Sequence, residues 1–188
     1  MVDDSHATGV IGKSGRGTME YYNLKEGVDI ISGTFGKALG GAGGGFIAAS
    51  KNTCAMLAQR SRPHLFSNCL PPVLCAIALA AIDYLEKNPG IVTSLMEKTK
   101  YMRSKIKAMG LNPVEGDSAI IPIIIGDTAK AIAISERMMK DGVFTIGFGF
   151  PVVPEGTARI RLQISDALNH DDLDKALTVI QKAFSVSG

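Results

Sequence analysis

The sequence is poor in residues that mark several classes of protein. It has no tryptophan, and 6% of its 188 residues are aromatic. The three cysteines, Cys54, Cys69 and Cys75, are odd in number and lack C-x-x-C spacing. They indicate reduced thiols rather than a disulfide framework or a zinc site, so we predict no metal and a cytoplasmic location. A mitochondrial location would apply if the source is eukaryotic and a transit segment precedes this chain.

Long apolar runs and a large excess of charge of one sign are also missing. No apolar stretch reaches the length that a membrane-spanning helix needs. The formal net charge is +2, without a long basic stripe. We therefore predict neither a membrane nor a nucleic-acid partner. What remains is an ordinary globular balance of 46% apolar and 20% charged residues.

The order of predicted elements is mixed α/β. Short β-branched or alternating runs indicate strands, and apolar residues at helical spacing indicate helices. Pro89 follows a long predicted helix, and we place a domain division there, giving domains 1–88 and 89–188. The predicted strands are 28–35 (a buried strand), 44–50, 119–127, one beginning at 143, and 158–165; the predicted helices are 51–60, 73–87, 91–109, 129–141 and 171–185, with a loop over 61–72.

The stretch "DIISGTFGKALGGAGGGFIAAS", 29–50, holds a single lysine, Lys37, among seven glycines. A buried or half-buried lysine amine loses its proton readily and can attack a carbonyl group. Bare backbone around it leaves room for a planar ring. The pattern is therefore consistent with a lysine that binds an aldehyde cofactor. A solvated lysine on a glycine-rich turn is the alternative.

Two further groups are placed to serve such a cofactor. Asp3 and His6 lie three residues apart at the end of an apolar pair. A carboxylate keeps a pyridine nitrogen protonated, and a histidine can hydrogen-bond a ring hydroxyl. Thr34, three residues before Lys37, could bind a phosphate oxygen. The alternatives are a helix N-cap for the Asp-Asp-Ser-His sequence and a simple β-former for Thr34.

Four strings together resemble the α-oxoamine synthases: "VDDSHATGVIGKSGRGTMEYY", "VDIISGTFGKALGGAGGGFIAAS", "QRSRPHLFSNCLPP" and "TARIRLQIS". The resemblance implies the aspartate-aminotransferase-like fold of PLP-dependent transferases (fold type I), here a partial large domain followed by an α+β small domain. It also implies pyridoxal 5'-phosphate as cofactor. The "SRPxLFSN" and "GKALGGAxGG" strings favour the branch that condenses glycine with acetyl-CoA to give 2-amino-3-oxobutanoate and CoA.

Three site roles near the cofactor ring follow from the resemblance. Lys37 matches the lysine that forms the Schiff base with the cofactor and later moves the glycine α-proton. Asp3 matches the carboxylate paired with the pyridine nitrogen. His6 matches the histidine that hydrogen-bonds the ring oxygen.

The resemblance also implies more distant contacts. Thr34 matches a phosphate ligand, while Ser67 and Asn68 match residues that reach the cofactor phosphate of the partner subunit in a homodimer. Arg161 matches the arginine that binds the amino-acid carboxylate, since a guanidinium group suits a carboxylate. The alternating pattern points Arg159 and Arg161 the same way and does not choose between them.

The position of Asp3 departs from the family pattern. Only two residues precede it, whereas the resemblance implies about half a polypeptide before this point. We therefore expect a truncated chain that is inactive by itself. The alternatives are a non-catalytic chain with only the capacity to dimerise, and another α-oxoamine synthase of the aminolevulinate or oxononanoate type.

Overall fold

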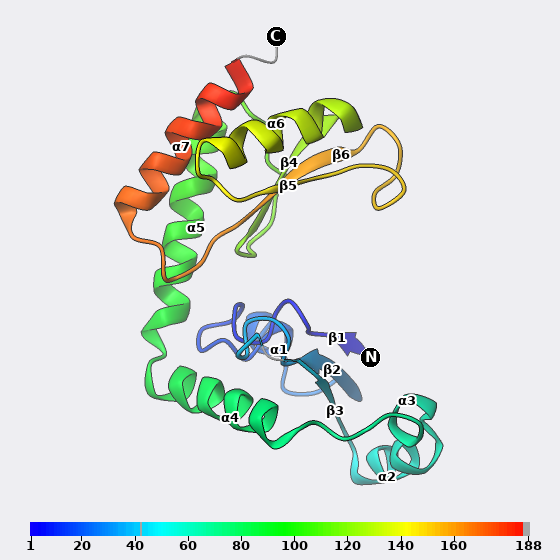
Figure 1. Cartoon of the computed structure of the whole chain (residues 1–188). Helices are drawn as coiled ribbons and strands as arrows, with labels where there is room; N and C mark the ends of the chain where they lie inside the picture. Colours follow the sequence, from blue (N-terminus) through cyan, green and yellow to red (C-terminus); the bar gives the residue numbers. More distant parts are fainter. Residues whose placement is uncertain (42, 186–188) are drawn as a thin grey trace. The chain divides into compact units, whose positions relative to one another are not determined.

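A computed structural model of the chain describes residues 1–41 and 43–185 (Figure 1). Ala42, inside the glycine-rich stretch, and residues 186–188, at the end of the second predicted domain, lie outside the described residues. The chain divides into two compact units, Met1–Thr93 and Ser94–Gly188. That boundary falls inside helix α5 (Gly90–Ala108), and the predicted domains 1–88 and 89–188 stay a prediction.

Unit 1 is built on a sheet of order β1-β2-β3. Strand β1 (Val2–Asp3) runs parallel to β2 (Ile30–Thr34), and β2 runs antiparallel to β3 (Gly45–Ala49). The predicted strands at 28–35 and 44–50 are confirmed. The prediction that the first of them is buried is wrong, because in β2 only Gly33 is buried and its other residues keep part of their surface exposed.

The helices of unit 1 follow local sequence signals. Helix α2 (Lys51–Arg60) begins at Ser50, whose hydroxyl accepts a hydrogen bond from the Thr53 amide, as an N-cap residue does. Helix α4 (Pro72–Lys87) begins at a Pro-Pro pair and ends at Asn88. Both helices confirm their predicted ranges.

Two one-turn helices of unit 1 were not predicted. They are α1 (Thr18–Tyr21) and α3 (Arg62–Leu65). The latter lies inside the stretch predicted as a loop, 61–72. Proline there acts as a helix starter rather than a breaker, because its fixed φ suits the first turn, where no backbone N–H bond is lost.

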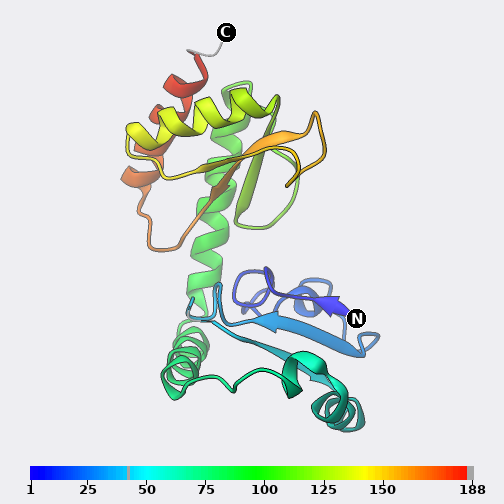
Figure 2. The ribbon, with the colours of Figure 1, turned by 45° about the vertical axis from the view of Figure 1, so that its right-hand side comes forward.

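Unit 2 is an antiparallel sheet of order β4-β6-β5, with α6 packed across all three strands (Figure 2). The strands are β4 (Ile120–Gly126), β5 (Ile146–Phe148) and β6 (Ala158–Gln163), and the helices that complete the unit are α6 (Thr128–Lys140), α7 (His170–Ser185) and most of α5. Pro122 lies in β4, an edge strand, where a sheet tolerates a residue that has no backbone N–H.

Alternation along β6 separates the core of unit 2 from its outer sheet face. Ala158, Ile160 and Leu162 are buried, while Arg159 and Arg161 between them stay half-exposed. This is the period of two predicted for 158–165. The core is completed by apolar residues of β4 and the helices, including Ile121, Ile123, Met102, Ile106, Ile134, Met138, Leu173 and Ile180.

Candidate functional site

The strand pairing of unit 1 brings Asp3 to the sheet edge from which the Lys37 loop departs. Asp3 pairs with Ser32 in the parallel β1–β2 register. Because carboxyl ends of parallel strands share one edge, the segment after β2, with Lys37, leaves the sheet on the side of Asp3. The Lys37 charge is among the causes that lower the pKa of Asp3. Asp3 and Lys37 are thus placed by two elements that are distant in sequence.

The Asp3 side chain is held as a carboxylate. It accepts hydrogen bonds from the Ser5 amide (2.9 Å) and from the Ser32 hydroxyl (3.0 Å). The bond from the Ser5 amide is the largest cause that holds the pKa of Asp3 below its usual value, and the hydroxyls of Ser5 and Ser32 add to it. An ionised acceptor at this point is what a protonated ring nitrogen would require.

Lys37 lies on the loop after β2 and its side chain is exposed. The buried or half-buried amine that the sequence interpretation assumed is therefore not what the described residues show. The backbone around Lys37 is open: a Cβ added to Gly36 or Gly41 would meet no atom closer than 3.4 Å. The backbone at Gly36 and Gly41 is therefore not crowded by other parts of the described chain.

The Thr34 hydroxyl is engaged inside the same loop. It donates to the Gly44 carbonyl (3.0 Å) and accepts from the Gly36 amide (3.0 Å). To bind a phosphate oxygen it would have to donate its proton there instead. Its role as phosphate ligand stays a prediction.

His6 is exposed in the turn that follows β1. Its neighbour Asp4, which was not proposed as a site residue, is only 2% exposed. The Asp4 carboxylate accepts from the Thr18 amide at the start of α1 (3.0 Å to one oxygen, 3.3 Å to the other). Asp4 thus binds the first residue of α1 from fourteen residues away. The N-cap position of α1 is Gly17, and no helix begins at the Asp-Asp-Ser-His sequence, so the N-cap alternative is not what the structure shows.

Ser67 and Asn68 lie in the exposed connection between α3 and α4. The Ser67 hydroxyl donates to the Pro63 carbonyl, which ties the connection to α3. Within the described residues, neither side chain has a hydrogen bond to the Asp3–Lys37 group. Their role toward a partner subunit stays a prediction.

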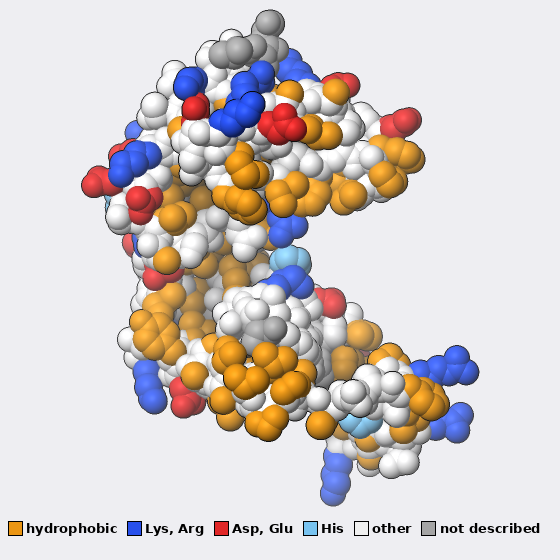
Figure 3. Space-filling model, viewed as in Figure 1, with side chains coloured by type: hydrophobic (Ala, Val, Ile, Leu, Met, Phe, Trp, Pro, Cys, Tyr) orange, Lys and Arg blue, Asp and Glu red, His pale blue; other side chains and the backbone are white. Residues whose placement is uncertain are grey.

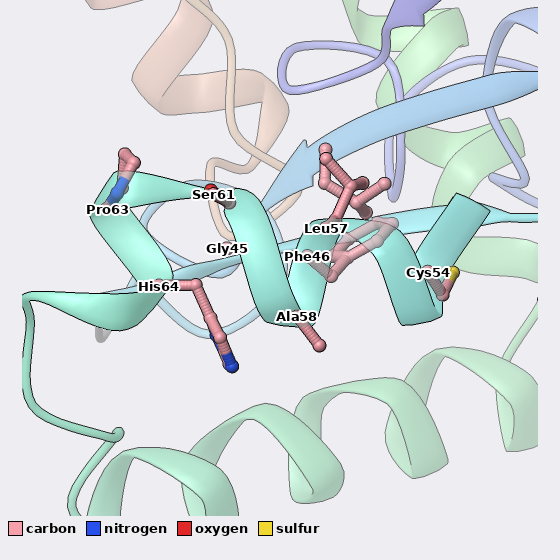
Figure 4. A pocket seen from close by; sticks show the side chains of 9 residues that line it. Gly45, Phe46, Cys54, Leu57, Ala58, Ser61, Pro63 and His64 are labelled. Carbon is pink, nitrogen blue, oxygen red and sulfur yellow. The ribbon is translucent and has the colours of Figure 1, made fainter. Parts of the chain in front are cut away.

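A pocket opens next to this connection (Figure 4). Strand β3 and helices α2 and α3 form its walls. The residues that line it are Gly45, Phe46, Ile47, Cys54, Leu57, Ala58, Ser61, Pro63 and His64. Its lining is mostly apolar and contains none of the predicted site residues.

Arg161 and Arg159 share the outer face of the unit 2 sheet but have different surroundings. The Arg159 Nε atom donates to the Thr157 carbonyl (3.0 Å). The Arg161 guanidinium lies over the Phe148 ring, 5.8 Å from its centroid, and lines a cavity beside β5. The alternating pattern alone left the choice between them open, and the role of Arg161 toward a carboxylate stays a prediction.

The types of polar group that unit 1 offers fit pyridoxal 5'-phosphate. An amine, a carboxylate and a hydroxyl, from Lys37, Asp3 and Thr34, match its aldehyde, ring nitrogen and phosphate respectively. In the part of the chain that the structure describes, no group of His, Cys, Asp and Glu could hold a metal ion. Its helices likewise include none long and apolar enough to cross a membrane.

The chain matches the model of the aminotransferase class I and II family over residues 1–180. It therefore belongs to that family. Among curated proteins it is 44% identical to mouse mitochondrial 2-amino-3-ketobutyrate coenzyme A ligase, over 94% of this chain and 42% of the relative. The enzyme of the same name from Escherichia coli K12 is 42% identical, over 94% of this chain and 44% of the relative.

A second branch is also similar. The 8-amino-7-oxononanoate synthase of Thermoanaerobacter pseudethanolicus is 38% identical over 96% of this chain and 46% of its own length. The chain thus spans less than half the length of each of these relatives.

Solved structures support the fold. A high-resolution structure of SPT with the PLP internal aldimine matches with a TM-score of 0.93 and 28% identity, over 100% of this chain and 47% of the other. Serine palmitoyltransferase from Sphingomonas wittichii gives 0.92 and 27% identity, over 100% of this chain and 47% of the other. The predicted fold, that of PLP-dependent class I and II aminotransferases, is confirmed.

Proposed function

We propose that this chain supplies catalytic residues to a pyridoxal-phosphate-dependent acyltransferase that condenses glycine with acetyl-CoA, giving 2-amino-3-oxobutanoate and CoA. The observation that carries the proposal is its 42–44% identity, over 94% of the chain, to 2-amino-3-ketobutyrate coenzyme A ligases. The placement of Asp3 and Lys37 at one edge of the sheet supports it.

Pyridoxal phosphate, when bound, supplies an electron sink for the carbanion that forms at the glycine α-carbon. In our proposal Lys37 would hold the cofactor covalently through its Nζ atom. Once the amino group of glycine has displaced it there, the free Lys37 amine would take the α-proton of glycine. Asp3 keeps the ring nitrogen protonated through its carboxylate. His6 hydrogen-bonds the ring oxygen, and Thr34 binds the phosphate.

Arg161 is proposed to bind the glycine carboxylate. A guanidinium group offers two parallel N–H donors to the two carboxylate oxygens, which orients the substrate as well as binding it. The Phe148 ring below the guanidinium supports this role by holding it through a cation–π contact.

The assembly is proposed to be a homodimer in which Ser67 and Asn68 reach the cofactor phosphate of the partner subunit. Their position on an exposed connection supports this role. As to location, the mouse and bovine relatives are named as mitochondrial enzymes, while the name of the Escherichia coli relative gives no compartment. The cytoplasmic location, with the mitochondrial alternative, stays a proposal.

A second candidate function is favoured by the oxononanoate synthase relative at 38% identity. Product assays with glycine, alanine and serine, each paired with acetyl-CoA and with longer thioesters, would separate the candidates.

Borohydride reduction tests the role of Lys37 directly. The full chain is incubated with a large excess of pyridoxal phosphate, reduced, digested and mapped by mass spectrometry. We expect the adduct on Lys37 and its loss in Lys37→Arg, while Lys51→Arg, in which a helical lysine of the same unit is changed, keeps it. An adduct on Lys13 or Lys51 in place of Lys37, or no adduct, would contradict the proposal.

A further inference from the structure

The loop of residues 7–17, between β1 and α1, is folded back on itself. The Gly9 amide donates to the Gly15 carbonyl (2.7 Å), and the Gly17 amide donates to the Ile11 carbonyl (2.9 Å). Thr8 and Arg16 form an antiparallel bridge. Backbone hydrogen bonds therefore join the two arms of the loop.

Glu20, on helix α1, binds the second arm of this loop at Ser14 and Arg16. Its carboxylate accepts from the Ser14 amide (3.0 Å), the Ser14 hydroxyl (2.7 Å) and the Arg16 amide (3.0 Å). Burial alone would raise the pKa of Glu20, but the hydrogen bonds from Ser14 and Arg16 outweigh it and lower that pKa. The carboxylate is thus an ionised acceptor for three donors of the loop.

Gly12 is fitted against the same carboxylate. A Cβ added there would lie 2.3 Å from Glu20 Oε2, closer than real Cβ contacts come. Its φ of +94° is one that residues with a side chain rarely adopt. The loop and the Glu20 side chain therefore specify each other's position.

His6 directly precedes the loop of residues 7–17, and the backbone is fixed on both sides of it. Before His6, the Asp4 carboxylate accepts from the Thr18 amide. After His6, the amides of Ala7 and Thr8 donate to the Asp4 carbonyl, each at 2.9 Å. Because Thr8 is also bridged to Arg16, a displacement of Arg16 would reach the segment that holds His6.

We propose that Glu20 is a positioning residue, which sets the conformation of the loop of residues 7–17 and, through Ser14 and Arg16, the place of the His6 imidazole. The hydrogen bonds from Ser14 and Arg16 to Glu20 support its effect on the loop without any cofactor. The consequence for a cofactor rests on the proposed function, in which His6 hydrogen-bonds the ring.

The test is made by NMR on the full chain without added cofactor. The measured quantities are the hydrogen exchange of the Gly9 and Gly17 amides and the imidazole signals of the three histidines. We expect Glu20→Gln to lower protection of both amides about tenfold or more, as loss of hydrogen bonds to a charged group predicts. The His6 signal should shift, while those of His64 and His170 stay in place. Glu26→Gln, a change at an exposed carboxylate of the same unit, should alter neither.

A second variant, with its own control, displaces the Glu20 carboxylate without removing its charge. Gly12→Ala should displace the carboxylate and reproduce the changes at Gly9, Gly17 and His6. Gly27→Ala is the matched control, since its φ is +99° but a Cβ there meets nothing within 4 Å.

The proposal is overturned if Gly9 and Gly17 keep their protection in Glu20→Gln and Gly12→Ala. It is also overturned if the His6 signal does not move, or if all three histidine signals move together, as general unfolding would cause. These outcomes do not depend on the reduction of a cofactor on Lys37, so the two proposals can fail separately.

Discussion

The two units differ in how much apolar surface they bury. Of the apolar residues buried in the described chain, four belong to unit 1, namely Ala7, Leu39, Ala78 and Val92, and seventeen belong to unit 2. Helix α4 is strongly apolar, yet only Ala78 is buried along its length. Orange hydrophobic side chains accordingly lie on the molecular surface in Figure 3. Unit 2 has a packed core, whereas unit 1 has mostly half-covered surfaces.

Six of the seven proposed site residues lie in unit 1, and Arg161 alone lies in unit 2. Most of the proposed site residues therefore lie in the unit that buries fewer apolar residues. Unit 1 depends instead on polar contacts, such as those of Asp3, Asp4 and Glu20. If unit 2 is held by its apolar core and unit 1 by polar contacts, substitutions in the two units should have different effects.

The largest effect is expected in the core of unit 2. Ile160 is fully buried in β6. We expect Ile160→Ala to lower the free energy of unfolding of unit 2 by about 2–5 kcal/mol, from lost transfer energy plus the cavity left behind. Hydrogen exchange of the β4 and β6 amides measures it. A loss below about 0.5 kcal/mol, which is typical of exposed positions, would mean that unit 2 lacks the rigid core described above.

A smaller but distinct effect is expected at Gly33 in β2. A Cβ there would lie 2.3 Å from the Phe46 ring, its partner across the strands. Gly33→Ala should therefore cost about 1–3 kcal/mol through overpacking, measured as urea unfolding followed by tyrosine fluorescence. Gly90→Ala, where a Cβ meets nothing within 4 Å, is the control and should be neutral. Equal effects of both changes would show that the packing of Phe46 is loose.

The polar anchor of unit 2 should show in its pH dependence. The Ser94 hydroxyl donates to Asp166, and Lys98 pairs with it at 2.9 Å. The Ser94 bond first, then Lys98, lowers the pKa of Asp166. A depressed carboxyl pKa stabilises the fold above the unfolded value of about 3.9, and this stabilisation is lost as pH falls through the lower folded pKa.

We therefore expect Asp166→Asn to cost about 1–2 kcal/mol at pH 7. The difference in the free energy of unfolding between this variant and the wild type, here called the gap, should close as the pH falls below about 4. Unfolding curves recorded from pH 7 to pH 2.5 measure the gap. Glu155→Gln, at an exposed carboxylate, should give no such difference. A gap that stays constant with pH would rule out an ionised Asp166 as its cause.

The smallest effect on folding is expected on α4 of unit 1. Leu79 is 63% exposed. Leu79→Ser should change the free energy of unfolding by less than about 0.5 kcal/mol, as surface changes do. Light scattering should show less self-association of the variant, because an exposed apolar residue is removed. A loss comparable to that of Ile160→Ala would mean that α4 is covered in solution.

The regular elements could be predicted from the sequence because their signals are local. The alternation in β6, the Ser50 cap and the helical spacing of α4 and α7 each lie within one short segment. The shared face of Arg159 and Arg161 followed from the same alternation. These predictions needed no knowledge of what packs on the segment.

The predictions that failed concern contacts between distant segments. The Asp4 carboxylate accepts from the Thr18 amide of α1, fourteen residues away, and nothing within Asp-Asp-Ser-His indicates that partner. The exposure of Lys37 and the incomplete burial of β2 depend on which atoms cover them, which periodicity does not report. Glu20 could have been suspected from the glycines and Ser14 just before it, since close-packed loops need an acceptor for their amides.

The parallel pairing of β1 with β2 bears on the order in which unit 1 folds. The hydrogen bond from Thr34 to Gly44 closes a span of ten residues, whereas that from Ser32 to Asp3 closes a span of twenty-nine. Loop-closure entropy makes the longer span costlier by about 1 kcal/mol. The β2–β3 hairpin, with the Lys37 loop at its tip, is thus favoured to form first, and Asp3 joins a strand that already exists.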